Sequence, residues 1–314
     1  MTTTRPIRFG FTGGASSKRE RLLDSARAVE ALGYSTFGLA DHFVRPFAPL
    51  IAGQAVADAT TTLRITQTVL AKELATLDVL SEGRLQVGLG AGWLRQEYED
   101  ASIRFDAASV RIERLEETAV ILKGLFGDEP FSFEGQHYAV NDLRGTPTPV
   151  QRPRPPIMIG GGGPKLLSVA ARQADIVQLM PSNRGGGTGL DPSQFSAPAI
   201  EEKIGWIRDA AGPRFDEIEL SAQLLECVVT DRPEEHLADF ADRIASVTER
   251  MGGARIDLGG DDLRASPIVA VGSLDEVCAR LVDTRDRYGI TYFAAPIDAK
   301  PEVLAPVIEA LAGI

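Results

Sequence analysis

Two hydrophobic patterns alternate along this chain. Short, mostly apolar runs have the character of buried strands, and the segments between them repeat apolar residues with the spacing of amphipathic helices. The predicted strands are residues 7–11, 35–40, 63–69, 84–90, 156–159, 175–180, 218–229 and 291–295. The predicted helices are residues 18–32, 47–58, 71–80, 107–126, 165–172, 199–211, 273–288 and 302–311.

The strand-then-helix unit therefore occurs eight times. Parallel strands need crossover helices, and eight such units close into a barrel. We expect an α/β protein with one (β/α)8 TIM-barrel domain over residues 1–314 and insertions after strands 4, 6 and 7. The alternative is a doubly wound open sheet, for which the glycine fingerprint is weak: its nearest match, Gly88 to Gly92, is followed by Trp93 and not by a helix start.

One strand-to-helix junction is rich in glycine. The apolar run 156–159 is followed by four glycines, Gly160 to Gly163, and Pro164 then begins a helical segment. Backbone N–H groups and the positive end of a helix dipole meet at such a junction, which suits a phosphate group. A tight turn needs only one or two glycines, so four in succession indicate that something approaches the backbone closely.

The end of the second predicted strand carries the residues best suited to chemistry. In a TIM barrel the active site lies where strands end and helices begin. Here the strand is followed by Asp41 and His42. Histidine titrates near neutral pH, so His42 can give or take a proton while Asp41 orients it or binds a ligand. In the alternative interpretation, Asp41 caps a turn and His42 packs.

Several other residues allow two interpretations. Trp93 and Phe43 either line a pocket or are ordinary aromatic residues at the barrel rim. We expect His137 to lie in a small hairpin and His236 to be solvated, with no role in chemistry. Arg184 and Lys203 could contact the anionic tail of a ligand.

Composition and charge exclude several classes of protein. With 44% hydrophobic and 25% charged residues, the chain has ordinary globular composition, and no apolar run reaches the ~18 residues of a membrane span. A net charge of −11 argues against nucleic acid as a partner. The N-terminus lacks the apolar core of a signal peptide, so we expect a cytoplasmic protein with Cys227 and Cys278 as buried free thiols. No histidine or cysteine spacing suggests a metal site.

Longer motifs resemble the bacterial luciferase-like superfamily, and most of all its actinobacterial branch of oxidoreductases that use the deazaflavin coenzyme F420. The motifs are LADHF at 39–43, AKELATLDVLSEGRL at 71–85, GLGAGWLRQEY at 88–98 and IGGGGP at 159–164. The resemblance covers nearly the whole chain, since FEGQHY at 133–138 and VGSLDE at 271–276 also match. Members of the superfamily that use FMN share many of these motifs.

The resemblance implies a TIM barrel with the cofactor across its carboxyl face, and a homodimer. His42 would be the catalytic acid or base, and Asp41 would bind beside the deazaflavin. Thr68 and Val69 would form a bulge behind the ring. The implied cofactor-binding residues are Asp41, Thr68, Val69, Ala91, Gly92, Gln96, Gly160, Gly161, Gly162, Gly163 and Pro164, of which the last five would hold the phosphate.

Two positions depart from the family pattern. Sugar-phosphate dehydrogenases of this family carry a catalytic glutamate directly after the glycines of strand four, where this chain has Trp93, which argues against that activity. The third strand also runs into the third helix at 69–72 without turn residues, although such a reversal normally takes ~2–6 residues. Either the family's longer loop is deleted, or residues are missing from the sequence at this point.

The sequence therefore predicts a deazaflavin-dependent oxidoreductase that transfers a hydride to or from a small organic molecule. An FMN-dependent monooxygenase of the same fold is the first alternative. A barrel that binds a cofactor or phosphate ligand without turnover is an alternative of another class. A sugar-phosphate lyase or isomerase would leave the motif matches unexplained.

Overall fold

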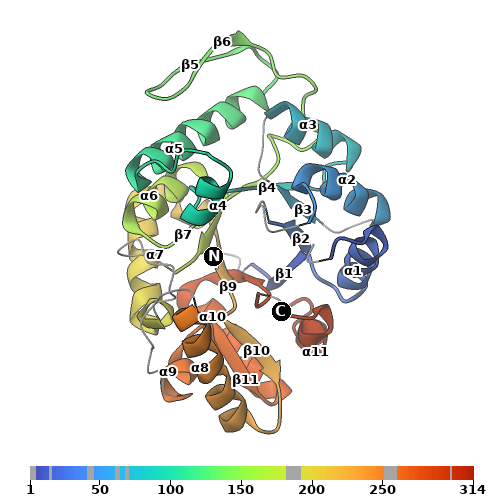
Figure 1. Cartoon of the computed structure of the whole chain (residues 1–314), viewed down its shortest axis with the longest axis vertical. Helices are drawn as coiled ribbons and strands as arrows, with labels where there is room; N and C mark the ends of the chain where they lie inside the picture. The colour runs from blue at the N-terminus through green and yellow to red at the C-terminus, as the bar shows by residue number, and fades with distance from the viewer. Residues whose placement is uncertain are drawn as a thin grey trace.

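The structure, a computed structural model, describes residues 5–13, 16–40, 46–60, 64–67, 71–181, 192–250, 260–297 and 299–314. Eight parallel strands form a closed barrel in the order β1, β2, β3, β4, β7, β8, β9, β12, with β12 pairing back to β1. Helices surround the barrel (Figure 1). The predicted TIM-barrel fold is therefore confirmed, and the open sheet is excluded because both of its edges are paired.

The barrel strands lie close to their predicted positions. Their bounds are β1 (Arg8–Gly13), β2 (Thr36–Leu39), β3 (Arg64–Gln67), β4 (Leu85–Leu89), β7 (Ile157–Gly161), β8 (Ile176–Leu179), β9 (Glu219–Gln223) and β12 (Ile290–Ala294). In β12 all five residues are buried. Strands of a parallel barrel are covered on both faces, which is why they appear in the sequence as continuous apolar runs.

Helices follow the barrel strands along the chain. They are α1 (Arg19–Ala31), α2 (Pro49–Ala59), α3 (Ala71–Leu80), α4 (Arg95–Asp100), α5 (Ala108–Leu125), α6 (Pro164–Gln173), α7 (Ala197–Ala211), α10 (Leu274–Tyr288) and α11 (Ala305–Ala310). Three short 3-10 helices, η1 (Pro192–Phe195), η2 (Gly212–Glu217) and η3 (Pro301–Leu304), precede or follow them. The short helix α4 was not predicted, because its six residues bury no side chain. None of the helices in the described parts of the chain is long and apolar enough to cross a membrane.

The start of α10 shows why the sequence predicted some helix ends well. Ser273 precedes the helix, and its hydroxyl accepts a hydrogen bond from the backbone N–H of Glu276. The Glu276 carboxylate in turn accepts the backbone N–H of Ser273 at 2.8 Å. This capping box satisfies two helix N–H groups, and Gly289 ends the helix with a left-handed φ of 71°.

The predicted strand 218–229 is two strands, so that prediction was wrong. Its first half is β9 in the barrel, and its second half is β10 (Glu226–Val229), which pairs with β11 (Val269–Gly272) outside the barrel. The chain changes partners between them, because the N–H of Leu224 bonds to Ala294 and that of Leu225 bonds to Ile268. Helices α8 (Pro233–Arg250) and α9 (Gly260–Ala265) pack beside this strand pair (Figure 1).

The segment between α5 and β7 contains the expected hairpin. Strands β5 (Phe131–Glu134) and β6 (Ala139–Leu143) pair antiparallel, and Figure 1 shows them projecting beyond α5. Glu117 on α5 accepts the backbone N–H groups of Gln136, His137 and Tyr138. The turn of the hairpin is thereby attached to the barrel's outer helix layer.

Candidate functional site

The carboxyl ends of the barrel strands bring two of the predicted groups together. Because all eight strands are parallel, they end at the same edge of the barrel. The turn after β4 contains Ala91 and Gly92, and the glycine run ends β7; these two strands are direct neighbours. Four other predicted site residues lie outside the described parts of the chain: Asp41, His42, Thr68 and Val69.

The glycine run spans the end of a strand and the start of a helix. Gly160 and Gly161 belong to β7, so only the last two glycines form the turn. A Cβ atom on Gly162 would lie 2.4 Å from the carbonyl oxygen of Met180. The close approach that the sequence suggested is therefore made, at this position, by the protein's own backbone.

Gly160 is different, because the protein leaves room beside it. A Cβ atom there would meet its nearest neighbour, Oε1 of Gln178, at 3.5 Å, which is an ordinary contact. The packing of the described chain therefore does not explain why this position is glycine. Close approach of a bound ligand to the backbone is one physical reason for a missing side chain at such a position.

Helix α6 starts directly at this junction. Gly163 is its N-cap residue, with no side-chain cap, and Pro164 is its first helical residue. The first backbone N–H groups of a helix have no partner within it and carry partial positive charge. The neighbouring ammonium of Lys165 binds the Glu113 carboxylate at 2.7 Å, and Lys165 together with His137 lowers the pKa of Glu113. An anionic group at this junction would therefore be held mainly by backbone N–H groups.

The turn after β4 is held in one conformation by an arginine from α5. Nε of Arg111 donates to the carbonyl of Ala91 at 3.0 Å, and its Nη2 donates to that of Gly92 at 3.3 Å. Gly92 has a left-handed φ of 72°, and a Cβ atom there would lie 2.1 Å from the Tyr98 hydroxyl. This position therefore needs glycine for both its backbone angle and its contact.

An aromatic pair supports that arginine. The guanidinium of Arg111 lies 3.9 Å from the ring centroid of Phe105, and Phe105 meets Tyr98 edge-on at 4.9 Å. Sequence analysis did not single out Arg111, since it lies in an amphipathic helix and its partners are backbone carbonyls.

Gln96, a predicted cofactor contact, lies on α4 and donates to Asp100 on the same helix at 2.7 Å.

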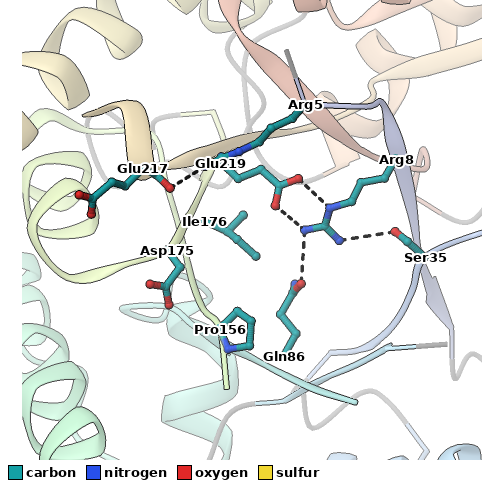
Figure 2. Close-up of a pocket in the computed structure, with 9 residues that line it drawn as sticks. All are labelled: Arg5, Arg8, Ser35, Gln86, Pro156, Asp175, Ile176, Glu217 and Glu219. Carbon is teal, nitrogen blue, oxygen red and sulfur yellow. Dashed lines mark hydrogen bonds and ion pairs between the residues drawn. The ribbon is translucent and has the colours of Figure 1, made fainter. Parts of the chain in front are cut away.

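A cavity of about 380 Å³ lies at the opposite, amino end of the barrel (Figure 2). Its lining comes from the strand starts, and Arg8 forms its central contact by binding both oxygens of Glu219 at 2.7 Å. The Arg8 guanidinium also lies 3.7 Å from the ring centroid of Tyr292. Burial raises the pKa of Tyr292, whose hydroxyl is 2.5 Å from Oγ1 of Thr36.

This amino-end cavity is best explained as part of the scaffold. Its central charged groups are paired: Arg8 binds Glu219, and Asp175 binds Arg154 at 2.5 Å. Active sites of TIM barrels form at the carboxyl end, whereas the amino end contributes stability. The candidate functional site is therefore the carboxyl edge around β4 and β7.

Other residues singled out from the sequence make contacts within the protein, away from the candidate site. Lys203 is buried and its ammonium donates to the backbone carbonyl of Gln194 at 2.9 Å. His236, expected to be solvated, is partly buried with Nε2 at 3.3 Å from the Glu226 carboxylate. Burial raises the pKa of Cys227 to about 12. Both cysteines are free, although only Cys227 is fully buried, and no group of metal-ligating side chains occurs in the described residues.

Comparisons with known proteins identify the family of this chain. Residues 3–291 match the model of the luciferase-like monooxygenase family. An F420-dependent glucose-6-phosphate dehydrogenase from Microbacterium testaceum is 28% identical over 75% of this chain and 71% of its own length. An FMNH(2)-dependent dimethylsulfone monooxygenase from Pseudomonas putida is 36% identical, but over only 33% of this chain and 29% of that protein.

Solved structures of other proteins share this fold. An F420-dependent secondary alcohol dehydrogenase superposes with a TM-score of 0.72 at 17% identity, over 98% of this chain and 99% of that one. The EDTA monooxygenase from Chelativorans superposes with a TM-score of 0.76 at 17% identity, over 98% and 93%. At these identities the superpositions establish the fold alone. The match to the family model over nearly the whole sequence shows that this chain belongs to the luciferase-like monooxygenase family of oxidoreductases.

Proposed function

We propose that this protein is a coenzyme F420-dependent oxidoreductase that transfers a hydride to or from a small organic substrate. The observation that carries the proposal is the junction of β7 and α6, where no packing contact among the described residues requires Gly160 to lack a side chain and the helix N-terminus faces the same edge. Relatives that use F420 match more of this chain than the FMN-dependent relative does, at 75% against 33%.

The residues of the chain have distinct roles in this proposal. Gly160 to Gly163 and the first N–H groups of α6 hold the cofactor phosphate, because backbone donors and the helix dipole favour a negative group. Ala91 and Gly92 border the ring system, with Gln96 and the bulge at Thr68 and Val69 completing its surroundings. When bound, the cofactor supplies the hydride chemistry, and the protein supplies position and shielding from water.

His42 exchanges the accompanying proton with the substrate in our proposal, and Asp41 orients it or binds the cofactor. A histidine suits this role because its pKa lies near neutral pH. We further propose that the 181–192 loop and the 232–266 insertion, after the sixth and seventh barrel strands, shape the substrate pocket. The protein acts in the cytoplasm, without nucleic acid as a partner.

We also propose a homodimer. Exposed apolar side chains lie on two neighbouring helices: Ile51 on α2 is 78% exposed, and Leu80 on α3 is 57% exposed. Burial of such side chains against a second copy removes apolar surface from water. Sedimentation velocity tests this, since a single species at the monomer mass would exclude it.

An FMN-dependent monooxygenase is the second candidate function. It is favoured by the P. putida relative, which has the highest identity of the relatives named above. That enzyme class needs reduced flavin and oxygen, so oxygen consumption with reduced FMN is its direct test.

The deciding experiment is equilibrium binding of F420 and FMN, side by side, by fluorescence quenching on the purified protein. Tighter binding of F420 supports the proposal, and tighter binding of FMN supports the monooxygenase. Gly160→Ala sharpens the test, because the protein has room for this methyl group and a phosphate against the backbone does not. We expect an unchanged melting temperature and at least about tenfold weaker cofactor binding, or ~1.4 kcal/mol. Gly205→Ala, in open space on α7, is the control.

A further inference from the structure

Cationic side chains lie together where the carboxyl end of α6 packs against α5. Lys123, on α5, donates from Nζ to Oε1 of Gln173, the last residue of α6, at 2.8 Å. Arg214 donates to the carbonyl of Ala171 at 2.6 Å and also to that of Ala174. Since these carbonyls belong to the same helix end as Gln173, the ammonium and the guanidinium share one site.

One carboxylate lies among these cations, and its oxygens are already bound. Asp175 binds Arg154 through both oxygens, at 2.5 and 2.9 Å, and accepts the backbone N–H of Ile157 at 2.8 Å. The guanidinium of Arg214 also lies 3.9 Å from it. Within the described ranges of the chain, Lys123 makes no ion pair with a carboxylate, because its hydrogen-bond partner is an uncharged amide.

This cluster of Lys123, Arg154, Arg214 and Asp175 carries excess positive charge. With the amine protonated, three positive charges face one negative charge, and the carboxyl end of α6 adds only about half a negative charge. Burial, and then the charges of the two arginines, lower the pKa of Lys123 to about 8. Near pH 8, roughly half of the Lys123 amines therefore lack the extra proton and are nucleophilic.

We propose that the ε-amine of Lys123 adds carbon dioxide and is held as a carbamate. Nζ attacks the carbon of CO2, a C–N bond forms, one C=O π bond becomes the carboxylate, and a proton of the amine passes to water. Nothing is oxidised or reduced. The addition replaces a positive charge with a negative one, so the cluster then holds two charges of each sign. CO2 is small and uncharged, which lets it reach a half-buried amine inside a cationic cluster.

Gln173 can partner both forms of this side chain. Its Oε1 accepts from the ammonium, and rotation of the amide about its last bond presents Nε2 as a donor to a carbamate oxygen. The nearby guanidinium groups of Arg154 and Arg214 favour an anion over a second cation at this position. The cluster lies at the opposite end of α6 from the β7 junction, so the carbamate is independent of the proposed cofactor.

Carbon-13 NMR of the protein, equilibrated with 13C-labelled bicarbonate near pH 8, tests the proposal. We expect a carbamate resonance that is lost in Lys123→Arg and retained in Lys72→Arg, the matched change at an exposed lysine on α3. The α-amino group of the chain also titrates near this pH, but its resonance is present in every variant. A spectrum of Lys123→Arg that matches the wild-type spectrum would overturn the proposal.

Gln173→Glu separates a carbamate held by the cluster from a reactive amine alone. The new carboxylate would pair with the ammonium and repel the carbamate, so we expect the Lys123 resonance to fall at least about tenfold. Circular dichroism verifies that the variants fold, and Lys123→Met replaces Lys123→Arg if the guanidinium is not accommodated. An undiminished resonance in Gln173→Glu would contradict stabilisation by this cluster.

Thermal unfolding gives a second, independent measurement. A group that adds to the folded form stabilises it, so dissolved CO2 at fixed pH and ionic strength should raise the melting temperature of wild-type protein and Lys72→Arg. Lys123→Arg should show no such rise. Equal shifts in all three proteins would mean that CO2 acts elsewhere on the chain and that the assignment to Lys123 is wrong.

Discussion

Glycines in this chain differ in what a side chain would meet, and this gives a prediction at the residue scale. We expect Gly162→Ala to destabilise the protein, because its new methyl group would lie 2.4 Å from the Met180 carbonyl and 2.5 Å from Pro181 backbone atoms. Overpacking of this kind costs about 1–3 kcal/mol. Gly205→Ala, within helix α7 and with nothing nearby, should instead stabilise by roughly 0.5–1 kcal/mol.

Urea unfolding of the two glycine variants measures both effects in the same protein. Opposite shifts in the unfolding midpoint are expected. Equal midpoints for Gly162→Ala and wild-type protein would show that the turn relaxes freely, and that the close approach to Met180 does not constrain it.

His42 gives a second residue-scale prediction, which depends on the proposed function. Removing a positioned acid or base typically slows turnover about 10²–10⁴-fold. We expect His42→Ala to lose turnover by this order while F420 binding is retained. His137→Ala is the control, since His137 lies beside Glu113 on the outer face at 3.4 Å. Normal turnover in His42→Ala with cofactor bound would exclude the proposed role.

At the scale of elements, several cationic side chains lie close together at the carboxyl end of α6, near its contact with α5. Lys123 donates to Gln173 at 2.8 Å, and Arg214 donates to the carbonyl of Ala171 at 2.6 Å. Arg154 binds the nearby Asp175. The negative end of the α6 dipole favours positive charge here, which accounts for the gathering.

The same group of cationic side chains makes the free energy of unfolding depend on pH. Burial, and then the charges of Arg154 and Arg214, lower the pKa of Lys123 from 10.5 to about 8. Between these values the unfolded chain binds the proton more tightly than the folded one, so this group makes stability rise as pH increases from about 8 to 10.5. Lys123→Met should flatten that rise, whereas Lys72→Met, an exposed lysine on α3, should not.

Unfolding free energies at a series of alkaline pH values measure the slope directly. The expected difference is a steeper rise for wild-type protein and Lys72→Met than for Lys123→Met. Parallel curves for all three proteins would mean that Lys123 titrates in the folded protein as it does in the unfolded chain.

At the scale of the whole molecule, an ion pair at the amino end bridges the barrel. Arg8 is on β1 and Glu219 on β9, with β12 between them, so the pair joins strands that do not touch in the sheet. Arg8→Met leaves a partly buried carboxylate without its donor, and we expect a loss of about 1.5–3 kcal/mol. Adding Glu219→Leu should recover part of this loss, since no charge is then left unpaired. Additive losses in the double variant would contradict a direct interaction.

The barrel could be predicted from the sequence because each parallel strand is buried on both faces and each helix is amphipathic. The division of 218–229 into β9 and β10 could not, since the apolar run continues while the hydrogen-bond partner changes from Ala294 to Ile268. The strand-to-helix junction at Gly160 was predicted from local pattern. The Arg111 contacts were not, because they depend on carbonyl directions that only the folded turn creates.

Because Cys227 in β10 is buried, the rate at which it is alkylated measures how often its surroundings open. Only thiolates react with alkylating reagents. The Cys227 thiol is buried and its pKa is raised to about 12, so it is not alkylated until its strand opens. The alkylation rate of Cys227 therefore measures how often the β10–β11 pair separates from its surroundings. This opening does not require the barrel strands to separate. Alkylation of this one native side chain thus reports whether the strand pair outside the barrel opens more often than the barrel that carries the site.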